Sequence, residues 1–366
     1  MPAKRGTFSK IILVMISLIF TVFFTEIILR YYYFGKLSIV NTNADRWKFY
    51  RYDEKLGWSS IPYSEGYFSN PRQGLNAYIK HNESGIRVND NPFESRGKSI
   101  LVVGDSVTAG FEVDNNETYC AILEKLFFEN GCNYRVYNAG VSGYGTDQSF
   151  WNLERLLSIV QPDYVIYMFT INDFVDNRRI KRANTEWGKP TFALSNGELV
   201  LMNSPSKKYE ISYYAYVNYT DESYEITEGY INEPLRLTMQ FIKDNLALFY
   251  PLKTIYTYLQ VSQESRIEKK AVDEDFKILE LILERMKRHE VKLFFTSYPS
   301  EDAKLYINNF RRISDKLDIA YLNIYPYFTE QSENYQWKKD AHWNKKGHLQ
   351  AAVALYELLK PHLCDQ

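Results

Sequence analysis

Five short segments along the chain predict β-strands, and most of them are apolar. They cover residues 99–103, 135–138, 164–169, 291–295 and 319–324. The first is rich in β-branched residues and ends at Gly104, which is typical of a buried parallel strand. Elsewhere, apolar residues recur at helical spacing. This spacing predicts helices near residues 119–127, 153–160, 276–286 and 347–361.

Strands and helices therefore alternate over most of the chain, which predicts a three-layer α/β/α domain. Its centre would be a mostly parallel, five-stranded sheet whose crossover connections are right-handed. In such sheets, ligands bind beyond the carboxyl ends of the strands. The residues that directly follow each strand are consequently the first candidates for a functional site.

A long apolar run from Ile11 to Leu29 precedes this pattern. About 19 residues at about 1.5 Å each can just cross a hydrocarbon core of about 30 Å. Lys4, Arg5 and Lys10 precede the run, so the positive-inside rule puts the amino terminus in the cytoplasm and the rest outside, periplasmic or extracellular. We favour an uncleaved single-pass signal-anchor over a cleaved signal peptide, because no small-x-small cleavage site follows. Glu26 lies near the outer end, where a carboxylate can reach the headgroups.

The changes of pattern along the chain predict its organisation. The cytoplasmic tip and anchor would occupy residues 1–30, and residues 31–97 would form a stalk that packs on the main domain. That domain would span residues 98–366, with an insertion at about 176–272 that acts as a lid or a substrate platform. Within the insertion, Asn196-Gly197 between two apolar runs predicts a β-hairpin.

Charge and cysteine content exclude several classes of partner. The formal net charge is −1, and no basic stripe is dense enough to bind nucleic acid. Cys120, Cys132 and Cys364 suggest neither a disulfide framework nor a metal site. A helix between the first two would separate them by about 18 Å, beyond the reach of a disulfide. We therefore expect free thiols, no metal ion and no cofactor.

Polar segments follow three of the predicted strands, and a fourth lies far downstream. They are Gly104-Asp105-Ser106, Asn138 to Gly145, Asn172-Asp173 and Asp340-Ala341-His342. A serine at a strand-to-helix turn is exposed at the sheet edge, where its backbone N–H favours a developing oxyanion. Acyl transfer needs a nucleophile, a base, a group that orients the base, and oxyanion donors. Together these segments can supply all four parts.

In this order, the four segments resemble the sequence blocks of the SGNH/GDSL hydrolases, and residues 53–58 and 85–87 resemble single-span exported members. The resemblance covers roughly residues 99–360. It implies an SGNH, flavodoxin-like fold and the hydrolysis of acyl esters through a covalent acyl-enzyme. By this resemblance Ser106 would be the nucleophile, His342 would be the general base, and Asp340 would orient that histidine.

The resemblance also implies an oxyanion hole made of the Ser106 N–H, the Gly143 N–H and the Asn172 amide. Two positions depart from the family pattern. The acid of the last block usually stands three residues before the histidine, whereas Asp340 stands two before it. The third block usually begins with glycine, where this chain has Thr170, which puts the fit of the substrate in question.

The sequence leaves three hypotheses open for the activity. The first is an exported serine esterase for short-chain, O-acetyl-like esters, such as those of an acylated envelope glycan. The second is an O-acyltransferase that uses the same residues and passes the acyl group to a glycan hydroxyl. The third is a non-catalytic glycan-binding protein whose surface is the aromatic insertion. Ser142 is the alternative nucleophile.

Overall fold

The computed structural model describes residues 3–34, 46–70, 75–92, 97–182, 185–211, 213–219, 224–230, 234, 246–247, 273–330, 332–337 and 341–364. Its contacts divide the chain into two compact units. One unit comprises Met1–Asn43 and Tyr230–Arg266, and the other comprises Ala44–Gly229 and Ile267–Gln366.

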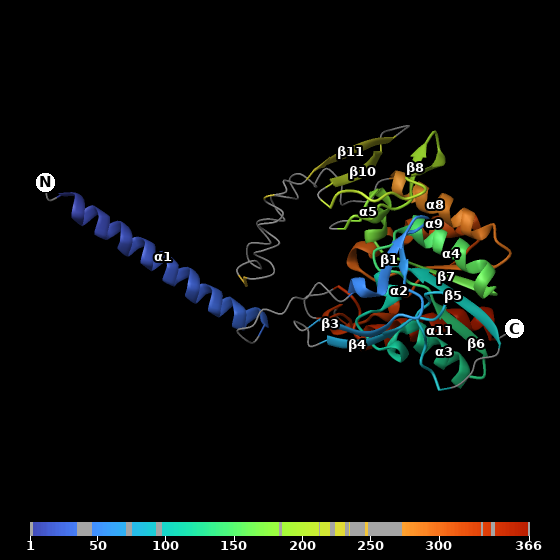
Figure 1. Cartoon of the computed structure of the whole chain (residues 1–366). Helices are drawn as coiled ribbons and strands as arrows, with labels where there is room; N and C mark the ends of the chain where they lie inside the picture. Colours follow the sequence, from blue (N-terminus) through green and yellow to red (C-terminus); the bar gives the residue numbers. More distant parts are fainter. Residues whose placement is uncertain are drawn as a thin grey trace. The chain divides into compact units, whose positions relative to one another are not determined.

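The larger unit is built around a parallel sheet that contains all five predicted strands (Figure 1). In spatial order these are β13 (Ala320–Leu322), β12 (Lys292–Ser297), β7 (Tyr164–Phe169), β5 (Lys98–Gly104) and β6 (Tyr134–Asn138). Gly104 lies opposite Met168, and Val102 lies opposite Asn138, so the carboxyl ends of the three strands β5, β6 and β7 meet at one edge. The predicted α/β/α architecture with a five-stranded parallel sheet is confirmed.

Helices cover both faces of the sheet (Figure 1). One face carries α3 (Tyr119–Glu129) and α11 (Lys345–Leu363), and the other carries α4 (Thr146–Val160), α8 (Asp273–Lys287) and α9 (Glu301–Leu317). Along β5, Ile100 and Val102 pack in the first of these cores, while Leu101 and Val103 pack in the second. A strand that is buried on both sides has no polar face, which explains its continuous apolar run.

Sequence analysis does not predict α9. The buried side chains of this 17-residue helix are only Ala303, Phe310, Ile313 and Ser314, so its apolar stripe is sparse. Its start is well defined, because Ser300 Oγ accepts a hydrogen bond of 3.0 Å from the Ala303 N–H. The helix is therefore specified by its cap and by a few contacts rather than by a strong pattern.

The expectation of free thiols is wrong for two of the three cysteines. Cys132 follows α3, Cys364 follows α11, and the two form a disulfide with Cα atoms 5.7 Å apart. Cys120, buried within α3, keeps a free thiol. The helix between Cys120 and Cys132 excludes only a disulfide between these two residues, whereas the partner of Cys132 lies 232 residues away in the sequence. Packing of α3 against α11 brings the two ends together.

Two antiparallel hairpins precede the sheet. The first follows a short 3-10 turn, η1 (Arg46–Phe49), and pairs β1 (Tyr50–Asp53) with β2 (Gly57–Ser60); the second pairs β3 (Glu65–Asn70) with β4 (Leu75–Lys80). Their apolar side chains form one cluster with Phe111, Val141 and Tyr144 of the loops that follow the sheet strands. Trp58 also donates a hydrogen bond of 3.1 Å from Nε1 to the Ser142 carbonyl. The hairpins thus contact the loops that carry two of the predicted blocks.

Two further hairpins belong to the predicted insertion. They pair β8 (Thr191–Ser195) with β9 (Glu198–Met202), and β10 (Tyr213–Tyr219) with β11 (Tyr224–Tyr230). The Asn-Gly turn prediction is confirmed, because Asn196 and Gly197 link the first pair with φ values of 51° and 78°. A small core of Ile180, Ala193, Ala215 and Val217 lies between these hairpins and the chain that precedes them.

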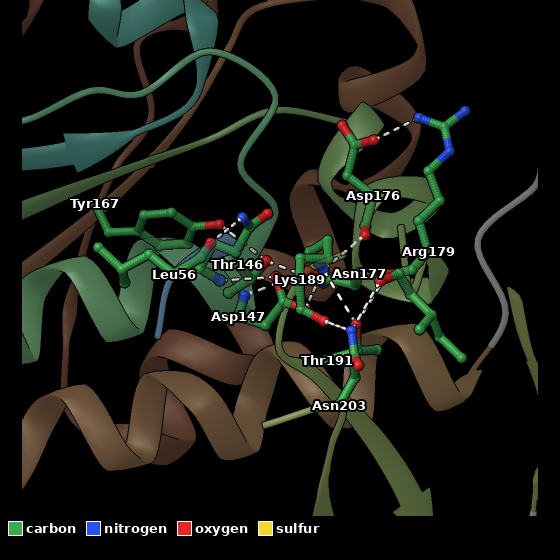
Figure 2. Close-up of polar contacts among 12 residues, drawn as sticks. Leu56, Thr146, Asp147, Tyr167, Asp176, Asn177, Arg179, Lys189, Thr191 and Asn203 are labelled. Carbon is green, nitrogen blue, oxygen red and sulfur yellow. Dashed lines mark hydrogen bonds and ion pairs between the residues drawn. The ribbon is translucent and has the colours of Figure 1, made fainter. Parts of the chain in front are cut away.

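A buried ion pair, which we call the insertion joint, attaches this region to the helical layer (Figure 2). Lys189 Nζ lies 2.5 Å from Asp147 Oδ2 at the start of α4, and the two side chains are 2% and 0% exposed. The same ammonium group donates a hydrogen bond of 3.0 Å to the carbonyl of Asp176 in α5 (Asn172–Arg178). Burial raises the pKa of Asp147 to about 6, although the charge of Lys189 acts in the opposite direction.

The smaller unit contains α1 (Ala3–Phe34). Its segment Ser9–Tyr32 is long and apolar enough to cross a membrane, with a mean hydropathy of 2.6. Glu26, near the carboxyl end of this segment, contacts other groups of the same unit. It is 8% exposed, forms a 2.7 Å ion pair with Arg30, and accepts a 2.7 Å hydrogen bond from the Ala247 N–H.

Candidate active site

Ser106 begins a one-turn helix, α2 (Ser106–Ala109), directly after β5. Asp105 caps this helix by accepting a 2.9 Å hydrogen bond from the Val107 N–H, and Gly110 ends it with φ of 59°. The turn is packed tightly, because a Cβ on Gly140 would lie 2.3 Å from the Ala109 nitrogen. The other residues of α2 are buried, so its partly exposed side chain is the serine.

His342 faces this serine although 236 residues separate the two in sequence. His342 Nε2 lies 2.8 Å from Ser106 Oγ. Two hydrogen bonds hold the histidine segment: its carbonyl accepts one of 3.0 Å from the Trp337 N–H, and the Ala341 carbonyl accepts one of 2.7 Å from the Tyr298 hydroxyl. The structure therefore brings the predicted nucleophile and the predicted base into direct contact.

The start of α11 anchors this segment from the other side. Trp343 is buried and stacks on Phe328, and the side chain of Asn344 caps α11. His348 is also buried, and its Nδ1 accepts a 3.2 Å hydrogen bond from the Tyr119 N–H. Burial lowers the pKa of His348 to about 3, so this second histidine is neutral and structural.

Asn172, at the start of α5, lies beside the nucleophile turn. Its exposed amide donates to Asp105 Oδ2 at 3.2 Å and to Asp176 Oδ2 at 3.1 Å. Thr170, which stands where the family usually has glycine, lies close by. Its hydroxyl is 2.8 Å from both Asp105 Oδ2 and Asp173 Oδ1. This departure from the family pattern thus links two carboxyl groups beneath the site.

Two buried carboxyl groups underlie this part of the sheet edge. Burial raises the pKa of Asp105, although hydrogen bonds from Val107, Thr170 and Asn172 act in the opposite direction. Burial also raises the pKa of Asp173 well above its ordinary value, and the nearby charge of Asp105 raises it further. We call Asp105, Thr170, Asn172 and Asp173, together with Ser106, the catalytic edge.

Gly143 has a φ of 77°, which favours glycine, and it lies against a side chain from the insertion. A Cβ on Gly143 would fall 1.4 Å from Nη1 of Arg182. The Arg182 guanidinium also lies 4.8 Å from the Trp47 ring and 4.9 Å from the Trp58 ring. Sequence analysis does not predict this cluster, because its members come from three segments without a shared motif.

The alternative nucleophile, Ser142, has no comparable surroundings. Its side chain is fully buried, and within the described part of the chain its Oγ has no hydrogen-bond partner. No base therefore contacts it there. Within the same residues, no group of three or more His, Cys, Asp and Glu side chains is arranged to hold a metal ion.

Asp340, predicted to orient His342, lies outside the described residues. Among the described residues, a carboxylate faces the histidine: Glu112 Oε1 lies 3.7 Å from His342 Nδ1, and its side chain is 3% exposed. Sequence analysis missed Glu112 because a single glutamate between two apolar residues carries no motif. Only its nearness to Ser106 in sequence could have drawn attention to it.

Part of the chain is similar to known proteins. Residues 102–220 match the model of the GDSL-like lipase/acylhydrolase family. Esterase TesA from Pseudomonas aeruginosa is 32% identical over 80 residues, which are 22% of this chain and 40% of that protein. An arylesterase from Vibrio mimicus is 30% identical over 76 residues, which are 21% and 38% of the two chains. The matched part thus spans about two fifths of the length of these curated relatives.

Solved structures are also similar to this chain. The esterase EstA from Pseudoalteromonas sp. has a TM-score of 0.41 at 12% identity, covering 73% of this chain and 99% of its own. The crystal structure of TesA has a TM-score of 0.40 at 14% identity, covering 72% and 99%. Over residues 102–220, which hold three of the four ordered blocks, the chain is thus similar to the GDSL-like lipase/acylhydrolase family.

Proposed function

We propose that this protein is a serine hydrolase that cleaves acyl esters through a covalent acyl-enzyme. The observation that carries the proposal is the 2.8 Å contact between His342 Nε2 and Ser106 Oγ. In this geometry the imidazole takes the hydroxyl proton while the oxygen attacks the ester carbonyl. The protonated imidazole then gives that proton to the leaving alcohol, and water releases the acyl group. The esterase names of the two curated relatives support this reaction.

In this proposal, the negative oxygen of the tetrahedral intermediate is bound by the Ser106 N–H, the Gly143 N–H and the Asn172 amide. Three features support these donors. Ser106 starts a helix, Gly143 has a positive φ, and the Asn172 amide lies within hydrogen-bonding distance of the Asp105 cap. Donors held in advance stabilise the transition state without reorganisation. We assign the orientation of the base to Asp340, which stands two residues before His342 rather than the three of the usual family block.

We propose that the substrate is a short acyl ester, of the O-acetyl type, on an envelope glycan. The hydrolase domain would lie outside the membrane, with α1 as a single-pass anchor whose amino terminus is cytoplasmic. The length and hydropathy of Ser9–Tyr32 support such an anchor. The guanidinium of Arg182, which lies beside Gly143 and packs on Trp47, supports a polar alcohol, because its N–H groups suit a hydroxyl-rich ligand.

The test uses the full chain in detergent, a fluorophosphonate probe for reactive serines, and p-nitrophenyl acetate as substrate. Ser106→Ala should abolish labelling and lower kcat by at least about a thousandfold, because the covalent step is lost. Ser142→Ala, the matched control, should keep both. A folded wild-type protein that neither labels nor turns over would sink the hydrolase proposal.

The same assay separates the alternatives. An O-acyltransferase would label at Ser106 but release little p-nitrophenol until a glycan acceptor is added, and the acetyl group would then be found on the glycan rather than as free acetate. A non-catalytic glycan-binding protein would bind the glycan equally well after Ser106→Ala and would show no turnover.

A further inference from the structure

We propose that Glu112 is a positioning residue for His342, which it orients and whose protonated form it stabilises. The proposal rests on the proposed hydrolase only for the role of His342 as base. Glu112 Oε1 lies 3.7 Å from Nδ1, while Ser106 Oγ lies 2.8 Å from Nε2 of the same ring. The carboxylate and the nucleophile therefore face the two opposite nitrogens of one imidazole. At 3.7 Å the contact is an ion pair with the protonated ring rather than a hydrogen bond, and an anion on this side stabilises the imidazolium that forms during the reaction.

The loop that carries Glu112 is rigid. Glu112 lies between α2 and a short turn, η2 (Asn115–Glu117), and its side chain is buried. The flanking Phe111 and Val113 are each 1% exposed, so the backbone cannot rotate without removing apolar side chains from the core. The Glu112 carboxylate is therefore held on the side of the His342 ring, whereas the carboxylate of a surface residue could move away from it.

Arg87, which is buried, donates hydrogen bonds to the same loop. Arg87 donates a hydrogen bond of 2.6 Å to the Ala109 carbonyl and one of 2.5 Å to the Val113 carbonyl. These carbonyls lie on either side of Glu112 in sequence. Burial lowers the pKa of Arg87 to about 10, and the charge of Glu112 opposes that shift. Arg87 thus stays cationic at neutral pH and makes a buried carboxylate tolerable beside it.

Among the described residues, Asp105 and His348 also interact electrostatically with His342. Asp105 lies next to Ser106. Burial raises the pKa of Asp105, and the charge of His342 acts in the opposite direction. His348 of α11 is neutral near pH 7 because burial lowers its pKa to about 3. Glu112 is the group whose carboxylate lies 3.7 Å from Nδ1 in the described part of the chain.

The far side of Glu112 borders a cavity of about 150 Å³. Asp114, Glu117 and Lys345 also line it, and Lys345 forms a 2.5 Å ion pair with Glu117. Glu117 is therefore a matched control. Glu117→Gln removes one negative charge from the lining of the same cavity and leaves Glu112, which faces His342, in place.

The decisive measurement is the protonation of His342, followed by NMR in the full chain in detergent with ¹³Cε1-labelled histidine. His342→Gln assigns the signal among the five histidines. In Glu112→Gln the midpoint of the His342 titration should fall to lower pH, because the imidazolium loses a neighbouring anion. In Glu117→Gln it should move less. This readout needs no turnover, so it remains decisive if the hydrolase proposal fails.

Kinetics provide the second readout. Glu112→Gln should lower kcat/KM for p-nitrophenyl acetate by about tenfold to a hundredfold and move its acid limb to lower pH. Glu112→Asp keeps the charge on a shorter side chain, so its titration midpoint should stay close to that of the wild type while its rate lies in between. Asp340→Asn, measured alongside, shows what the predicted acid contributes.

Two outcomes would overturn the role of Glu112. One is a Glu112→Gln protein whose titration midpoint and kcat/KM equal those of the wild type. The other is an equal change in Glu112→Gln and Glu117→Gln. If Glu112→Gln does not fold, Glu112→Asp decides, since an unchanged kcat/KM in that variant would also refute the role.

Discussion

The catalytic edge and the insertion joint stabilise buried carboxyl groups in different ways. At the edge, Asp105 and Asp173 are bound by hydroxyl and amide groups, among them the Thr170 hydroxyl at 2.8 Å from both. At the joint, Asp147 is paired with Lys189 (Figure 2). Close by, Asp275 of α8 is paired with Arg178 of α5, and both side chains are buried.

Because the two regions bind their carboxyl groups differently, substitutions in them should change different properties of the protein. Removing one partner of a buried ion pair leaves the other charge without compensation, which is strongly destabilising. Removing one neutral donor at the edge removes no counterion, and Asp105, for example, keeps its hydrogen bonds from the Val107 N–H and the Thr170 hydroxyl when the Asn172 amide is lost. We therefore expect substitutions at the joint to change the free energy of unfolding, and substitutions at the edge to change the rate.

The largest expected effect on stability is that of Lys189→Met, which breaks the joint. It should lower the free energy of unfolding by about 3–5 kcal/mol, because Asp147 would remain buried without its cation. Denaturant unfolding of the full chain in detergent measures this change. Below the transition, kcat should stay close to that of the wild type.

Two variants serve as controls for that change. Lys208→Met removes an exposed lysine of the same insertion, which pairs with Glu186, and should change stability by less than about 1 kcal/mol. The double variant Lys189→Met/Asp147→Leu should recover part of the loss, because both buried charges disappear together. If Lys208→Met lowered the free energy of unfolding as much as Lys189→Met, the buried ion pair of the joint would contribute no more to stability than an exposed one.

The next effect concerns the catalytic edge. Asn172→Ala should lower kcat by about a hundredfold to a thousandfold, as expected for the loss of one oxyanion donor. Its stability should change little, because the amide is exposed. Asn177→Ala on the same helix is the matched control. It removes a buried amide that accepts from the Asp147 N–H, so it should lower stability and leave kcat unchanged.

The smallest effect is a dependence of stability on pH. Burial raises the pKa of Asp147 to about 6 from its ordinary 3.8, so between these values the folded state binds the proton more tightly than the unfolded state. The contribution of Asp147 to the free energy of unfolding therefore falls as the pH rises from about 4 to about 6. Asp147→Asn should lack this decline, as unfolding at several pH values would show. Parallel pH profiles for the two proteins would contradict it.

The fold could be predicted where local pattern and burial agree. Tyr164–Phe169 is buried on both faces, so its continuous apolar run predicts the strand directly. The β8–β9 hairpin was equally predictable from the sequence, because Asn-Gly favours positive φ values at its turn. Helix α9 was not, since most of its residues face solvent and leave only a sparse apolar stripe.

The candidate site could be predicted in part. The positions of Ser106 and Asn172 follow from the rule that parallel strands present their carboxyl ends at one edge, and the motif around His342 pointed to the base. Glu112 lay beyond such rules, because nothing in its neighbourhood marks it as a partner of a histidine 230 residues downstream. Arg182 likewise reaches Gly143 only through the course of the insertion.

The sequence by itself thus determined the sheet, its layers and the chemical character of each strand end, because these depend on periodicity and on residues adjacent in the chain. The tertiary structure alone decided which distant groups meet. It joined Cys132 to Cys364, Lys189 to Asp147 and Glu112 to His342. Such pairs depend on how helices and loops pack around the sheet, and the burial that gives each pair its energetic weight exists only in the folded chain.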